Sequence, residues 1–159
     1  MIPGIGCHRG GAGRRSRFLW LLLLVCAGCS GLKGPATTDT SSDTLPGLEK
    51  RVEFLERYVE FRRTYTDLGF QIKYQNNSGG LVPGPTEWDI RLVAVVPAAE
   101  LAEWIPPEVT AESAADVSWL SGVPGAERAK EIEEWYVNGG RLVGVDRKHS
   151  VVAFHDERN

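Results

Sequence analysis

The chain has 159 residues, with 18 lysines and arginines against 21 aspartates and glutamates, and a formal net charge of −3. Four of the basic residues and none of the acidic ones lie in the first 28 residues, so the rest of the chain is acidic and shows no basic face for nucleic-acid binding. The cysteines are Cys7, Cys26 and Cys29. The segment after Cys29 therefore has no cysteine for a disulfide, a nucleophile or a metal cluster, and its length suits one domain.

Residues 1–28 contain the three parts of a secretory signal. Four arginines, with no acidic residue among them, precede the uncharged run 18–25, and small residues follow that run. The stretch from Phe18 to Gly28 is shorter than the roughly 20 residues that cross a bilayer, so we expect a cleaved signal and no permanent transmembrane helix. The pair Arg14-Arg15 leaves twin-arginine export open as an alternative to Sec export.

Residues 25–29, Val-Cys-Ala-Gly-Cys, resemble the lipobox of bacterial lipoproteins, in which small residues precede an invariant cysteine. The sequence departs from that pattern at Cys26, where leucine is usual. The resemblance implies cleavage before Cys29, a diacylglyceryl thioether on Cys29, and a membrane anchor in the cell envelope; two or more acyl chains hold a protein stably. Ser30 resembles the residue that directs sorting to the outer membrane in cells with two membranes.

Residues 29–47 are rich in Ser, Thr, Gly and Pro, which predicts a flexible tether. An amphipathic, coiled-coil-like helix is expected over 48–66, with two apolar stripes at heptad-like spacing. The aliphatic stripe is Leu48, Val52, Leu55 and Val59, and the aromatic stripe is Phe54, Tyr58, Phe61 and Tyr65. Either both stripes dock on the domain as one wide face, or the aliphatic stripe pairs with another chain while the aromatic stripe packs on the domain.

Residues 67–159 are expected to form a small α+β domain. Period-two alternation predicts strands over 68–74 and 88–96, and a closing hairpin over 141–145 and 151–155. Helices are predicted over 98–105 and 125–137, with Glu131, Glu133 and Glu134 of the second on its solvent-facing side. The expected architecture is a mainly antiparallel four-stranded sheet with helices on one face.

Candidate chemistry in this domain is sparse. One metal hypothesis gathers Asp146, His149, His155 and Asp156, because zinc accepts histidine and carboxylate ligands. However, a regular strand would hold His155 about 20 Å from His149, at ~3.3 Å per residue. Ser150 and His149 are adjacent and would face opposite ways in a strand. We therefore expect no catalytic residues, no metal and no cofactor.

Tryptophan is the remaining feature. Trp88, Trp104, Trp119 and Trp135 are more than a small core needs, and tryptophan is enriched in binding hot spots. Spacing places three of them on inward faces, which leaves Trp119 as the candidate for a partly exposed binding contact. The sequence thus predicts a membrane-anchored extracytoplasmic lipoprotein that is a binding or structural module of the envelope. The alternative is a small cell-envelope hydrolase whose carboxylates assemble in the fold.

Overall fold

The computed structural model describes residues 35–78, 83–108, 110–112 and 115–158. These residues belong to one compact unit, 34–159. The predicted signal, the lipobox-like segment and Cys29 lie outside the described residues. Among the described residues, no helix combines the length and the apolar character needed to cross a membrane.

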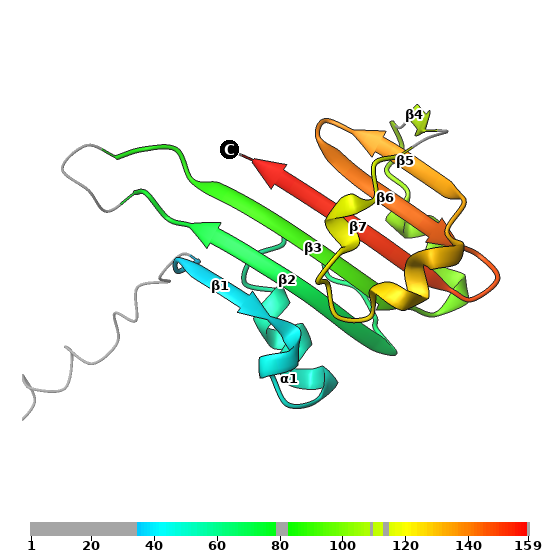
Figure 1. Ribbon diagram of the computed structural model, residues 1–159, viewed down its shortest axis with the longest axis horizontal. Helices are drawn as coiled ribbons and strands as arrows, with labels where there is room; N and C mark the ends of the chain where they lie inside the picture. The colour runs from blue at the N-terminus through cyan, green and yellow to red at the C-terminus, as the bar shows by residue number, and fades with distance from the viewer. Residues whose placement is uncertain (1–34, 79–82, 109, 113–114, 159) are drawn as a thin grey trace, which may run out of the picture. The chain divides into compact units, whose positions relative to one another are not determined.

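A single antiparallel sheet of seven strands organises the described chain, in the order β1-β2-β3-β7-β6-β5-β4 (Figure 1). The strands are β1 (Thr38–Ser41), β2 (Asp67–Gln75), β3 (Glu87–Val95), β4 (Thr110–Glu112), β5 (Glu134–Asn138), β6 (Arg141–Asp146) and β7 (Val151–Arg158). The helices are α1 (Gly47–Leu55) and the 3-10 helices η1 (Ser42–Thr44), η2 (Ala98–Trp104), η3 (Ser118–Leu120) and η4 (Ala126–Glu131). The expected four-stranded sheet is wrong: the four predicted strands correspond to the neighbouring β2, β3, β7 and β6, and three further strands extend the sheet at its two sides.

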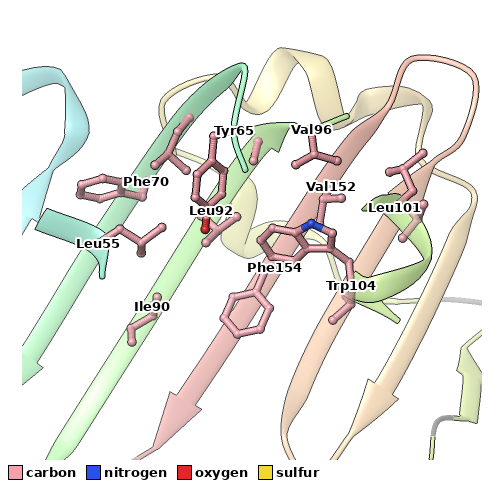
Figure 2. Packing of buried hydrophobic residues seen from close by; sticks show 14 of the residues in the cluster. Leu55, Tyr65, Phe70, Ile90, Leu92, Val96, Leu101, Trp104, Val152 and Phe154 are labelled. Carbon is pink, nitrogen blue, oxygen red and sulfur yellow. The ribbon is translucent and has the colours of Figure 1, made fainter. Parts of the chain in front are cut away.

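Helices lie on both faces of the sheet, which corrects the expected arrangement on one face. Alternation along the strands points Phe70, Leu92 and Phe154 to one face, here called face A. Segment 47–65 and η2 pack on face A, and Figure 2 shows the buried side chains there. Val93 and Ala153 point to the opposite face, face B, where residues of η3 and η4 cover them. The sheet therefore has an apolar core on each side.

The first strand lies in the segment expected to be a tether. β1 pairs with β2 from Thr38↔Tyr74 to Ser41↔Gln71. Beyond that point the Ser42 hydroxyl accepts a hydrogen bond from the Phe70 N–H at 3.0 Å, and Arg51 of α1 donates to the Leu68 carbonyl at 3.1 Å. Ser42 is completely buried. Polar side chains therefore complete the backbone hydrogen bonds of β2, which explains how a Ser- and Thr-rich segment becomes part of the fold.

The helix expected over 48–66 is shorter, because α1 ends at Leu55. Leu55 is fully buried on face A, and Leu48, Val52 and Val59 are half-buried against the same core. In the described structure all four residues of the aliphatic stripe therefore pack on the domain's own core. The aromatic stripe still packs inward without a continuous helix, since Phe54 stacks on a β2 ring and Phe61 contacts rings of η2 and β7.

The helix predicted over 125–137 is also wrong. The chain forms the short 3-10 helix η4 and then strand β5, whose Trp-Tyr-Val centre favours a strand. The Trp135 ring lies directly on Gly144, where an added Cβ would be 2.6 Å from ring atom Cζ3. A bulky ring opposite a glycine in the next strand anchors β5 to the sheet. The apolar residues of 125–137 also fit helical spacing, so the sequence pattern predicted a helix and not this strand pairing.

Candidate functional site

A pocket of about 510 Å³ opens on face A, at the end of the sheet where β3 begins and β7 ends. We call it the aromatic pocket, because five rings line it: Tyr58, Phe61, Tyr74, Trp88 and Phe154. Its polar lining includes Arg57, Glu60, Arg141 and Asp156. The volume falls within the range of roughly 300–1,000 Å³ found for small-molecule sites.

Strand register assembles the sheet side of this pocket in adjacent rows. Tyr74 of β2 is opposite Trp88 of β3, so two rings come together at the strand ends. In the next row, Ile90 is opposite Asp156 of β7, and Asp156 is opposite Arg141 of β6. The pocket therefore combines a ring row with a charged row, and neither row is contiguous in the sequence.

Asp156 holds the charged row in place. Its Oδ2 atom accepts from the Arg141 Nε–H at 2.8 Å, and its Oδ1 atom accepts from the Trp88 indole N–H at 3.2 Å. The Asp156 side chain is 14% exposed, whereas that of Arg141 is 52% exposed. Arg158 adds a cation–π contact, with its guanidinium carbon 5.1 Å from the Trp88 ring centroid. The carboxylate thus fixes the indole and the guanidinium, while about half of the Arg141 side chain remains accessible to a ligand.

The segment after α1 supplies the other wall. Tyr58 contacts Tyr74 edge to face at 5.3 Å, and Phe61 contacts Phe154 edge to face at 5.3 Å. The Tyr58 hydroxyl donates to the Ala36 carbonyl at 3.1 Å, which joins this wall to the start of the described chain. These ring contacts give the pocket a preformed shape.

Trp119 differs from its expected role as a partly exposed contact. It is buried on face B, only 7% exposed, and its ring stacks on His155 with centroids 5.0 Å apart. His155 Nε2 lies 3.1 Å from Asp89 Oδ1. The ring therefore covers a polar pair between two strands. Trp88, which spacing assigned to the core, is the tryptophan that lines the aromatic pocket.

The four residues of the metal hypothesis, which the sequence did not favour, divide between separate places. Asp146 and His149 meet at the β6–β7 turn, with Asp146 Oδ2 2.6 Å from His149 Nδ1, and Glu131 of η4 brings a third ligand atom to the group. These three could hold a metal, since their ligand atoms lie within 4.8 Å of one another. His155 and Asp156 have the partners described above. Asp146 Oδ1 also accepts from the Lys148 and His149 N–H groups at 2.9 and 3.1 Å, so the group stabilises the turn.

The stability of this turn should depend on acid pH. Desolvation by itself raises the pKa of Asp146, but hydrogen bonds from His149 and the backbone outweigh it, so the pKa lies below the ordinary carboxyl value. Because the folded pKa is the lower one, the charged form stabilises the fold above the unfolded value of about 3.9, and this contribution is lost as pH falls through the folded pKa. Urea unfolding of wild type and Asp146→Asn should show a free-energy difference that shrinks between about pH 5 and pH 2. A difference that does not change with pH would contradict this assignment.

One signal of the pocket is present in the sequence, although the alternation that predicted the strands does not use it. Asp156 falls in phase with Val152 and Phe154 on β7, and Arg141 falls in phase with Val143 on β6. A charge at the end of an apolar face, repeated on two strands of one hairpin, indicates a polar site where the core ends.

Comparisons with family models, curated proteins and solved structures give no match to this chain.

Proposed function

We propose that this chain is a lipid-anchored extracytoplasmic lipoprotein that acts as a binding module, with the aromatic pocket as its ligand site. The anchor rests on the lipobox-like residues before Cys29, and the ligand site rests on the pocket itself. The observation that carries the binding function is the Arg141–Asp156–Trp88 arrangement in a pocket that five aromatic rings line, Trp88 among them. Its location is the cell envelope, and the outer membrane where the cell has two membranes.

Binding fits this pocket better than hydrolysis does. Glycoside hydrolysis by two carboxylates requires one to act as acid and the other to reach the substrate or a water. Asp156 instead accepts bonds from Trp88 and Arg141 on its two oxygens. Its geometry is that of a positioning group, and the rings, Arg141 and Glu60 are the groups that would contact a ligand.

The anchor is tested by labelling with a radioactive or clickable fatty acid in a bacterial host. Wild type and Cys26→Ala should be cleaved and labelled to the same extent, because only Cys29 carries lipid. Cys29→Ala should accumulate as an uncut, unlabelled precursor, a complete loss rather than a partial one. Labelling that survives in Cys29→Ala and disappears in Cys26→Ala would move the anchor to Cys26.

A further inference from the structure

Chain length limits how far Cys29 can lie from the aromatic pocket. Pro35 lines the pocket, and its carbonyl accepts a hydrogen bond from Asn76 Nδ2 at 3.0 Å. Together with the bond from Tyr58 to Ala36, this fixes the start of the described chain beside the pocket. Cys29 precedes Pro35 by six residues, which span at most about 21 Å when fully extended. If Cys29 carries the anchor, the ligand must be reachable near the bilayer surface.

The charges of the pocket favour a zwitterion. Two arginines, Arg57 and Arg141, line it together with two acidic residues, Glu60 and Asp156. Arg57 also pairs with Glu53 at 2.8 Å, and both oxygens of Asp156 accept from Trp88 and Arg141, so Glu60 is the pocket carboxylate nearest to hand for a cationic group. Arginine binds phosphate through paired N–H donors, and aromatic faces with nearby carboxylates attract an alkylammonium group. A purely anionic surface would instead repel this chain, because its acidic residues outnumber its basic ones. The lining thus complements one positive and one negative group on the same small ligand.

Residue types at this end of the sheet are also those of a membrane interface. Tryptophan and tyrosine are enriched at headgroup level, because their rings are apolar and their N–H or O–H groups remain hydrated. Trp88, Tyr74 and Tyr58 are half-buried here, and Arg158 lies over Trp88. A headgroup bound in a pocket with such a lining would leave the acyl chains of that lipid in the bilayer.

We infer that the aromatic pocket binds the zwitterionic headgroup of a phospholipid, a phosphodiester joined to an alkylammonium, in the membrane that carries the anchor. This inference rests on the proposed function. The domain would then bind lipids of the same membrane that carries its anchor. Because the linker is only a few residues long, the local concentration of headgroups would be high, and even a pocket with low affinity would be occupied.

The test uses the mature chain 29–159 with Cys29→Ser, so that any membrane binding is independent of lipidation. Cosedimentation with phosphatidylcholine vesicles and with phosphatidylglycerol vesicles is compared, and soluble glycerophosphocholine is added as a competitor. Binding should favour phosphatidylcholine and should decrease with the competitor. The quenching or shift of tryptophan fluorescence on binding gives a second measure at the pocket.

Arg141→Gln and Arg147→Gln form a matched pair. Arg141 begins β6 and Arg147 directly follows its last residue; the two side chains are 52% and 53% exposed, and each pairs with one carboxylate. Loss of a charge-assisted hydrogen bond should weaken vesicle binding roughly tenfold or more in Arg141→Gln and leave Arg147→Gln unchanged. Arg57→Gln, a second pocket variant on an exposed side chain, should weaken binding in the same direction.

Three results would overturn the headgroup inference: no vesicle binding, equal loss in both arginine variants, or a preference for phosphatidylglycerol. Displacement by soluble glycan fragments instead of glycerophosphocholine would assign the pocket to a carbohydrate and overturn it as well. Fatty-acid labelling at Cys29 is measured separately, so an anchored protein without a preference for headgroups is distinguished from one without an anchor.

Discussion

Leu55→Glu should unfold most of the domain at room temperature. Leu55 is fully buried at the end of α1, among apolar side chains of face A that Figure 2 shows around it. Removal of a buried leucine side chain costs about 2–5 kcal/mol, and a carboxyl in its place adds a desolvation penalty. The sum exceeds about 5 kcal/mol, which is comparable with the whole stability of a typical domain.

Leu48→Glu is the matched control, because Leu48 lies seven residues earlier on the same helix and is only half-buried. Its glutamate can reach water, so urea unfolding should show a much smaller loss. Circular dichroism and sedimentation of residues 34–159 measure folding and mass together. A folded Leu55→Glu monomer derived from a wild-type dimer would instead support pairing of chains through Leu48, Val52, Leu55 and Val59.

The central strands could be predicted because each carries its own signal. β2 alternates Leu68, Phe70 and Ile72 with Gly and Gln, and the β6–β7 hairpin has a turn marked by Asp146. Such alternation requires only that one face be buried. The strand predicted over 88–96 corresponds to β3, which lies between β2 and β7.

The strands that were missed depend on tertiary partners. β1 contains no large apolar side chain, and its place follows from the open edge of β2, which Ser42 and Arg51 help to complete. β5 has apolar residues at spacings that also fit a helix, and its identity follows from the fit of Trp135 on Gly144. Sequence patterns indicate which residues are buried. Whether β1 and β5 form strands depends instead on their neighbours in the fold, the open edge of β2 for β1 and Gly144 for β5.

The in-phase charges of Asp156 and Arg141 indicate a polar site, but the sequence could not show which residues meet there, for a related reason. Trp88, Asp156 and Arg141 lie far apart in the sequence and meet only through the registers of two strand pairs. A one-residue shift in either register would turn a whole strand over and send its pocket residue to face B. The tryptophan count pointed to a binding surface, but only the register identifies which tryptophan lines it.

Gly69→Ala should destabilise the fold strongly through the cover of face B. A Cβ added at Gly69 would lie 1.9 Å from the Pro124 carbonyl oxygen and 2.6 Å from its carbon, so backbone and not a flexible side chain stands in the way. The loop before η4 must move, and with it the buried Val123 and Ala129, which pack on the sheet. Overpacking usually costs about 1–3 kcal/mol, and a backbone obstruction places this change at or above about 3 kcal/mol.

Gly84→Ala is the matched control for this substitution. Its added Cβ would lie 3.4 Å from the Asn77 Cβ in an exposed loop, which is close to an ordinary contact, so its effect should stay within about 0.5 kcal/mol. Urea unfolding compares the two, and the fluorescence of Trp119 and Trp135, both in the face B core, reports whether the cover has loosened. The covering loop requires glycine on the strand beneath it only if the free energy of unfolding of Gly69→Ala is well below that of Gly84→Ala. Equal stability of the two variants would mean that residues 121–126 do not lie against β2 in solution.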